Sequence, residues 1–168
     1  SLDLSTDPSQ GDSQEKLTRW PFGLQGNHGM FRLTALNISH NELAGLPLDF
    51  YRLTNLQDLR AHHNKLKVVS SDLSNLQQLK LMWMHNNMLA NLPLTISTLT
   101  NLNQLSLDHN RLNSLPTSLG FLTQMAQLRV EHNPLQSPPV EILRTVLKPP
   151  DLFDFSIVLR YLRHLHST

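Results

Sequence analysis

Residues 79–101 read LKLMWMHNNMLANLPLTISTLTN, and residues 102–124 read LNQLSLDHNRLNSLPTSLGFLTQ. In both segments leucine or methionine stands at the first, fourth and sixth positions, asparagine at the ninth and L-P at the fourteenth and fifteenth. The same pattern extends to both sides without an insertion. Its asparagines lie 23 residues apart, at Asn41, Asn64, Asn87, Asn110 and Asn133. A fixed period of 20 to 50 residues is typical of stacked repeat architectures.

Each unit follows the pattern L-x-x-L-x-L-x-x-N-x-L-x-x-L-P-x-x-(L/I/F)-x-x-L-x-x. The alternating L-x-L predicts a short strand with one buried face. A coil of this length cannot bury its leucines alone, so successive coils stack and their strands form a parallel sheet. The asparagine follows the strand, where its amide can satisfy backbone groups that the turn leaves unpaired.

Proline marks the start of the convex side in most units. Pro47, Pro93 and Pro116 lack an N–H and hold φ near −65°, which suits a turn but not a strand. The second unit departs from this pattern, with Val69 and Ser70 in place of L-P. We therefore expect the convex segment of the second unit to differ from the others.

The unit resembles the repeat of the leucine-rich repeat family, in its 23-residue cytosolic form, and is most similar to the Ras-suppressor or plant intracellular Ras-group type. The resemblance covers about residues 30–143. It implies an α/β solenoid, a curved leucine-rich repeat horseshoe segment with a parallel concave β-sheet. It also implies a non-catalytic module that binds a protein partner on the concave sheet. Small GTPases, kinases and phosphatases are the partner classes that the resemblance suggests.

Four segments are expected along the chain. They are a polar N-terminal tail (1–16), an N-terminal cap or partial repeat (17–32), five leucine-rich repeats (33–147) and a C-terminal capping helix (148–168). The ends need covers because terminal coils would otherwise expose core leucines. The cap and partial repeat would use Trp20, Phe22 and Met30. The C-terminal helix is indicated by an apolar stripe at helical spacing, made of Phe155, Val158, Leu159, Leu162 and Leu165. Binding of a partner is the alternative interpretation of this stripe.

Strand residues that point away from the core line the concave face. By register they are Ala35, Asn37, Ser39, Asp58, Arg60, His62, Leu81, Trp83, His85, Gln104, Ser106, Asp108, Gln127, Arg129 and Glu131. Trp83 has no core to enter from its position, Leu81 faces the same way, and Arg60 lies one strand away in the same column. Exposed tryptophan beside arginine is typical of interface hot spots. The alternative is that Arg60 merely covers Trp83.

We therefore predict one partner-binding surface on the concave face. Its residues are Leu81, Trp83, Arg60, His62, His85, Asp58, Ser106, Asp108 and Arg129.

The nine histidines fall in shared columns. His40, His63, His109 and His132 each precede the ladder asparagine, and a second column holds His62 and His85. With Asp108, the second column can be drawn as a zinc site. A repeat protein, however, always stacks column mates as neighbours. A solvated polar edge is therefore the favoured interpretation, a pH-sensitive surface is another, and we expect no metal and no cofactor.

The sequence gives no support for catalysis. Ser39, His62 and Asp58 share the concave side, but no nucleophile elbow accompanies them. The six glycines are scattered and form no phosphate-binding loop. We expect no enzyme activity and no catalytic residue. The sequon that begins at Asn37 is interpreted as a chance occurrence, since a glycan there would obstruct the concave face.

Composition narrows the classes of protein to which this chain can belong. A net charge of +1 gives no electrostatic footprint for nucleic acid, and no apolar run approaches the roughly 20 residues of a membrane span. The absence of cysteine favours a reducing compartment, so a cytoplasmic signalling scaffold is expected. The alternative is a recognition or regulatory domain excised from a larger multidomain signalling protein or enzyme, with catalysis elsewhere. An extracellular receptor segment is disfavoured by the missing cysteines and secretory signal.

Overall fold

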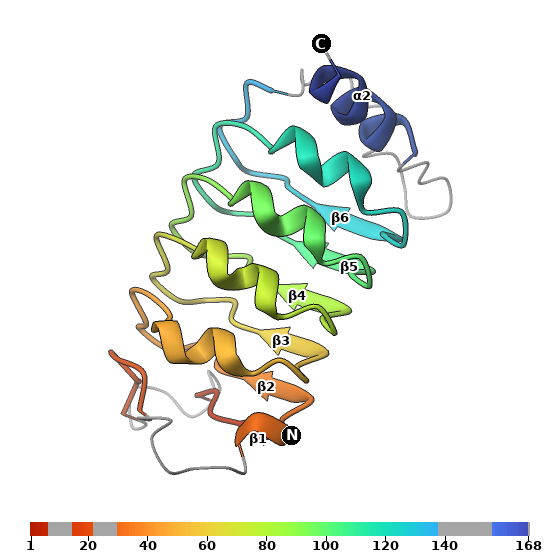
Figure 1. Cartoon of the computed structure of the whole chain (residues 1–168). Coiled ribbons are helices and arrows are strands. Elements are labelled where there is room, and N and C mark those ends of the chain that lie inside the picture. The colour runs from red at the N-terminus through yellow and green to blue at the C-terminus, as the bar shows by residue number, and fades with distance from the viewer. Residues whose placement is uncertain (7–14, 22–29, 138–155, 168) are drawn as a thin grey trace.

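The computed structural model describes residues 1–6, 15–21, 30–137 and 156–167. Its strands form one parallel sheet in chain order, from β1 to β6 (Figure 1). The strands are β1 (Leu2–Asp3), β2 (Ala35–Asn37), β3 (Asp58–Arg60), β4 (Leu81–Trp83), β5 (Gln104–Ser106) and β6 (Gln127–Arg129). The helical elements are the 3₁₀ helices η2 (Met30–Arg32), η3 (Leu48–Arg52), η4 (Ser71–Asn75), η5 (Leu94–Thr98) and η6 (Thr117–Phe121), and the α-helix α2 (Ser156–His166).

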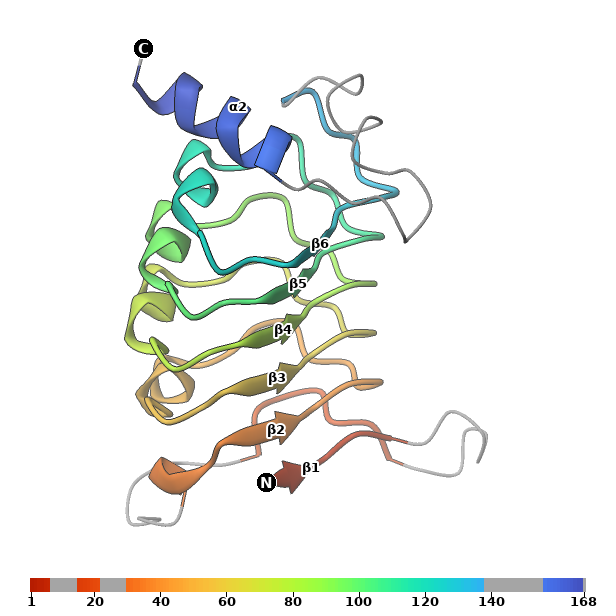
Figure 2. The ribbon, with the colours of Figure 1, turned by 90° about the vertical axis from the view of Figure 1, so that its right-hand side faces the viewer.

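Strands β2 to β6 pair at the 23-residue register that the sequence predicts. Leu59 lies opposite Met82, and Met82 lies opposite Leu105. These three side chains are buried, while the residues on either side of Met82 remain partly exposed on the other face. Figure 2 shows the strands on one side of the solenoid and the helical turns on the other. The predicted fold class, a leucine-rich repeat solenoid with a parallel concave sheet and a C-terminal helix, is confirmed.

The convex turns are alike even where the sequence departs from L-P. Pro47 and Pro93 precede η3 and η5 with extended backbone, and Ser70 takes the same place before η4, with φ −65° and ψ 153°. The Ser70 hydroxyl accepts from the backbone N–H of Asp72. This hydrogen bond caps η4, so the second unit keeps the same convex helix that the prolines introduce elsewhere. The expected difference is absent.

The asparagine ladder joins each coil to the preceding one. The amide nitrogen of Asn87 donates to the carbonyl oxygens of Ala61 and Met84, both at 3.0 Å. Its Oδ1 accepts from the backbone N–H of Leu66 at 3.0 Å. Buried backbone groups of two neighbouring coils are thereby satisfied, as the sequence predicts. The same pattern recurs at Asn41, Asn64, Asn110 and Asn133.

The residue before each ladder asparagine has a left-handed backbone. Its φ lies between 53° and 58° at His40, His63, Asn86, His109 and His132. Among residues with a side chain, asparagine and histidine are enriched in this conformation. The histidine column therefore has a backbone cause that the repeat pattern alone did not reveal.

The N-terminal segment is not a free tail. Leu2–Asp3 forms β1 beside β2, and the backbone N–H of Leu4 donates to Asn37 at 2.7 Å. Further along, the N–H of Leu17 donates to Oδ1 of Asn41 at 2.8 Å. The expectation of a polar tail over residues 1–16 is thus wrong for residues 2–6, because their backbone groups extend the sheet.

Trp20 belongs to this N-terminal cover. Its ring lies edge-on to Phe50, with centroids 5.6 Å apart. Met30 begins η2, whereas Phe22 lies outside the described residues. A partial coil over 17–32 remains our interpretation of this segment.

Helix α2 packs against η6 at the other end of the solenoid (Figure 1). Leu162 is fully buried, and the Arg163 guanidinium donates to the carbonyl of Gly120 at 2.9 Å. The ring of His166 lies 5.1 Å from that of Phe121. These contacts fit a capping role. Leu165, another residue of the predicted stripe, is partly buried. The remaining stripe residues, Phe155, Val158 and Leu159, lie outside the side chains that the structure describes.

Replacing one ladder amide should destabilise the solenoid. Asn87→Leu removes the partner of several buried backbone groups and should lower the free energy of unfolding by roughly 1–3 kcal/mol. Asn91, exposed and off the ladder, is the matched control, and Asn91→Leu should cost less than about 0.5 kcal/mol. Urea unfolding measures both, and equal costs would refute the ladder's role.

The packing of α2 gives a second test. Leu162→Ala leaves a cavity between α2 and η6 and should cost about 2–5 kcal/mol. Arg160 is exposed on the same helix, so Arg160→Ala should change stability by no more than about 0.5 kcal/mol. Thermal and urea unfolding of both variants check this. Indistinguishable variants would mean that α2 does not cap the solenoid.

Candidate functional site

Trp83 projects from the concave face of β4, as its register predicts. The guanidinium carbon of Arg60 lies 4.8 Å from the centre of the Trp83 ring. Arg60 also forms a salt bridge with Asp58, with Nη2 and Oδ2 at 3.1 Å. Arg60 is therefore held by a carboxylate while it stacks on the indole. This geometry combines a cation–π contact with an ion pair at a partly exposed site.

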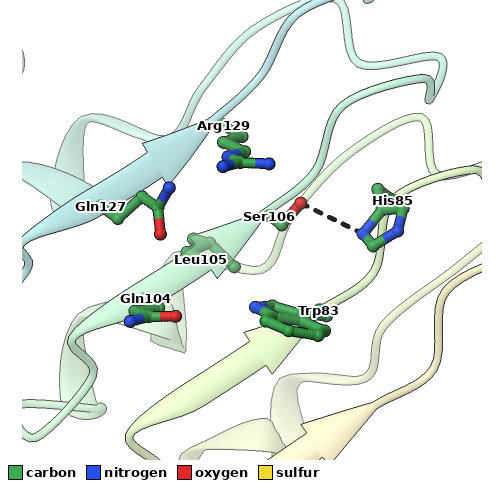
Figure 3. Close-up of a pocket in the computed structure, with 7 residues that line it drawn as sticks. All are labelled: Trp83, His85, Gln104, Leu105, Ser106, Gln127 and Arg129. Carbon is green, nitrogen blue, oxygen red and sulfur yellow. Dashed lines mark hydrogen bonds between the residues drawn. The ribbon is translucent and has the colours of Figure 1, made fainter. Parts of the chain in front are cut away.

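The other side of the Trp83 ring borders a hollow of about 260 Å³. Figure 3 shows the side chains around it, which come from β4, β5, β6 and the second residue after β4. They are Trp83, His85, Gln104, Leu105, Ser106, Gln127 and Arg129. We call this the Trp83 hollow. It offers one aromatic wall and several hydrogen-bonding groups, the composition of a small recognition site.

Arg129 supplies the positive charge of the Trp83 hollow. Its side chain forms no ion pair with any residue that the structure describes. The side-chain amide of Gln127 satisfies both residues when it is oriented with its oxygen towards Arg129. In this orientation the oxygen accepts from Nε and Nη2 of Arg129 at 3.0 and 3.1 Å. The amide of Gln127 is neutral, so these hydrogen bonds do not offset the charge of Arg129. The Trp83 hollow is therefore suited to an acidic or carbonyl-bearing group.

The structure gathers most of the predicted surface around Trp83. The rings of His62 and His85 lie 6.1 and 6.4 Å from the indole. Leu81, at the start of the same strand, is partly exposed on the same face. Arg129 lies across the Trp83 hollow, as described above.

Ser106 and Asp108 need a different description. Ser106 is buried rather than exposed, with 7% of its surface accessible. Its hydroxyl donates to Oδ1 of Asp108 at 2.6 Å and lies 3.2 Å from Nδ1 of His85 (Figure 3). Ser106 lines the concave hollow as its register predicts, but it is buried because it contacts His85 and Asp108. Its part in partner binding stays a prediction. Ser106 forms the floor of the Trp83 hollow and orients His85.

Three residues that line the Trp83 hollow are not among the predicted partner-binding residues: Gln104, Leu105 and Gln127. Leu105 is a buried strand residue. Gln104 and Gln127 were placed on the concave face but were not counted among the partner-binding residues. The signal was their register: each occupies the same strand position as Leu81, one and two coils further along. Residue type drew attention to Trp83, whereas position would have included the two glutamines.

Histidines crowd the edge where the strands turn. Burial, followed by the imidazoles of His85, His40 and His63, lowers the pKa of His62 to about 4. Burial also lowers the pKa of His63 and of His85. Desolvation disfavours the charged form of each ring, and neighbouring rings disfavour a second charge. His62 is therefore neutral near pH 7.

The rings in this group stack in pairs. His62 and His85 are nearly parallel with centroids 4.3 Å apart, and His40 and His63 with centroids 4.4 Å apart. The Nδ1 of His62 is buried and has no hydrogen-bond partner among the described residues. The favoured interpretation from sequence, a solvated polar edge, therefore does not describe His62.

Comparison with known proteins supports the fold. No protein-family model and no curated protein matches the chain. Among solved structures, a leucine-rich repeat protein of Leptospira interrogans is 30% identical over 68% of this chain and 29% of its own, with a TM-score of 0.64. An internalin of Listeria monocytogenes is 24% identical over 63% of this chain and 31% of its own, with a TM-score of 0.56.

A third similar structure is the leucine-rich repeat ectodomain of a membrane receptor kinase from Arabidopsis thaliana, in complex with Casparian strip integrity factor 2. It is 30% identical over 60% of this chain and 13% of its own, with a TM-score of 0.56. This chain therefore has the fold of leucine-rich repeat proteins. It spans about a third or less of the length of each of the three.

Within the described part of the chain, no helix has both the length and the apolar character that crossing a bilayer demands.

The depressed pKa of His62 predicts loss of stability in acid. Unfolded His62, with a pKa near 6.5, takes up a proton that folded His62 does not accept until about pH 4. The stability that neutral His62 contributes to the folded state is fully present above about pH 6.5. It is lost as the pH falls towards 4. At pH 5 the loss is about 1–2 kcal/mol. Urea unfolding in metal-free buffer at pH 7.5 and 5 measures it.

The comparison between variants isolates His62 from the carboxylates that also titrate in acid. His62→Ser should lose less stability between pH 7.5 and 5 than the wild type, whereas Gln77→Ala should lose as much as the wild type. An identical pH dependence in all three proteins would contradict the assignment to His62.

Proposed function

We propose that this chain is a non-catalytic protein-interaction module that binds a protein partner on its concave sheet, centred on Trp83. The observation that carries the proposal is the Trp83 hollow, where an aromatic wall faces the guanidinium of Arg129, which forms no ion pair within the described residues. Tryptophan and arginine are the residues most enriched at interface hot spots. The Arabidopsis ectodomain, solved in complex with Casparian strip integrity factor 2, is a precedent for partner binding by this fold.

The predicted residues have distinct roles in this proposal. Trp83 provides apolar area, and Leu81 extends it along β4. Arg129 provides a positive charge that no described residue pairs with in a salt bridge, so we infer that the partner presents an acidic side chain beside an apolar one. Arg60 and Asp58 hold the indole, while His62 and His85 border it on the side of the strand turns.

The geometry of Ser39, the serine that directly precedes His40, agrees with a non-catalytic role. Ser39 is buried, and its hydroxyl donates to Oδ1 of Asn37 at 2.7 Å. It is therefore engaged by an amide and does not present a nucleophile. The same burial and the hydrogen bond make Ser39 a structural residue of the turn.

The finer assignments rest on sequence features. The 23-residue period with L-P and the absence of cysteine support a cytosolic repeat of the Ras-suppressor or plant intracellular Ras-group type. On that basis we propose a cytoplasmic location and, as partner classes, a small GTPase, a kinase or a phosphatase. The second candidate function is a recognition domain of a larger multidomain protein. The short coverage of the similar structures supports this alternative.

The test replaces Trp83 while leaving the fold intact. Trp83→Ala should keep the wild-type circular dichroism, because the indole is outside the core. In quantitative affinity capture from cell extract, proteins held by wild type should be lost with Trp83→Ala. A central interface tryptophan commonly contributes about 2 kcal/mol or more, roughly thirtyfold in affinity.

The controls separate the concave face from the rest of the surface. Gln77→Ala changes an exposed position outside the sheet and should capture the same proteins as wild type. Arg129→Ala should weaken capture of the same proteins, and the wild-type interaction should weaken with salt. A folded Trp83→Ala protein with unchanged capture would place the binding surface elsewhere. An unfolded variant would mean that Trp83 is structural.

A further inference from the structure

Three imidazoles from two neighbouring coils converge at the edge of the concave sheet. His40 belongs to the first repeat, and His62 and His63 belong to the second. Each ring offers one nitrogen, and these three nitrogens all lie within 4.8 Å of one another. Such a group is independent of the Trp83 hollow, which contains none of the three residues.

The repeat backbone explains why these rings meet. His40 and His63 occupy the same column in left-handed conformation, with φ of 58° and 53°. Their rings stack with an interplanar angle of 13°, and the ring of His62 stands at 88° to that of His40. Because the ladder fixes the backbone on both coils, the three rings are brought together by the fold itself.

The chemistry of the three rings suits a metal ion. Neutral imidazole is a preferred ligand of zinc, copper and nickel. The Nδ1 of His62 is buried without a hydrogen-bond partner in the described residues, a condition that costs free energy unless something binds there.

The geometry requires a modest adjustment. Three nitrogens at about 2.0–2.1 Å from a tetrahedral zinc ion lie roughly 3.4 Å from one another. The distances between the three nitrogens, which are at most 4.8 Å, therefore have to shrink by up to about 1.4 Å. The parallel rings of His40 and His63 must also turn until their lone pairs converge. Rotation about χ1 and χ2 can supply both changes, since His63 is exposed and His40 is partly exposed.

We propose that His40, His62 and His63 form a three-histidine site for a divalent transition-metal ion, zinc in the first instance, with water in the fourth position. This differs from the expectation of no metal. It also differs from the alternative set of His62, His85 and Asp108. Among the described residues, only His40, His62 and His63 bring three ligand atoms within 4.8 Å of one another. In the alternative set, Asp108 is already bound by the hydroxyl of Ser106.

Metal binding at this position would have two consequences. It would join the first and second repeats through side chains, in addition to the backbone ladder. It would also place a cation near the concave surface, because the ring of His62 lies 6.1 Å from that of Trp83. The site itself stands on the three rings alone and does not depend on the proposed partner.

The direct test is calorimetric titration of zinc into chelator-treated protein that carries no histidine tag. Wild type should bind one zinc ion per chain. His63→Asn and His40→Asn should bind at least tenfold more weakly, since each loses one of three ligands. Asparagine suits these positions because Asn86 occupies the same column with φ of 53°. The variant at the third ligand is His62→Ser. Serine suits this position because Ser39 occupies the same column in the first repeat.

The matched control is His109→Asn. His109 has the same left-handed backbone, and its ring stacks on His132 with centroids 4.0 Å apart, but it lies outside the three-histidine group. This variant should bind zinc as wild type does. His85→Asn should also retain binding, whereas loss of binding there would favour the alternative set and overturn the proposal.

A second readout locates the metal. Nickel or copper at the proposed site should quench Trp83 fluorescence in wild type and His109→Asn, but much less in His63→Asn; Trp83→Phe subtracts the emission of Trp20. Circular dichroism establishes that each variant is folded. Equal zinc affinity in all variants, or binding of several ions with no dependence on His40, His62 and His63, would overturn the proposal. The partner experiment could then still succeed.

Discussion

The asparagine ladder is the constraint on which the rest of this structure depends. Asn64 shows how it acts: its Nδ2 donates to Ile38 at 2.8 Å, and its Oδ1 accepts from the N–H of Leu43 at 3.0 Å. One side chain thereby satisfies backbone groups of the coil before it. A coil that was one residue longer would carry its amide past these partners. The ladder thus fixes the period, and the period fixes every other column, including the outward positions of the sheet.

Sequence reasoning was most successful where the period applies. Strand register, buried columns, the ladder and the outward position of Trp83 follow from counting residues. It failed where the period stops. Leu2 pairs with Leu36, a separation outside the 23-residue register, and two residues of strand have no periodicity of their own. Ser70 replaces proline by a different mechanism, since its hydroxyl caps the turn that proline shapes through φ.

The candidate site shows the same division. Alternation along β4 is sufficient to turn Trp83 outward, but the burial of Ser106 depends on how His85 and Asp108 lie over it. Likewise, histidine columns are visible in the sequence, whereas the left-handed backbone at His63 is not. Side-chain contacts between coils depend on rotamers, and rotamers are decided by packing rather than by register.

The short 3₁₀ helices of the convex side determine the shape of the opposite surface. Each of η3 to η6 has five residues, and a 3₁₀ helix has three residues per turn against 3.6 in an α-helix, which makes it the narrower of the two. Strands are spaced by about 4.8 Å on the concave side. Because the convex helices are narrow, neighbouring coils are spaced only slightly wider on the convex side than on the concave side. The solenoid therefore curves gently. The distance from β2 to β6 is about 19 Å, close to the length of six extended residues. A gently curved sheet of these dimensions is wide enough for a partner segment of about six extended residues laid crosswise over the strands.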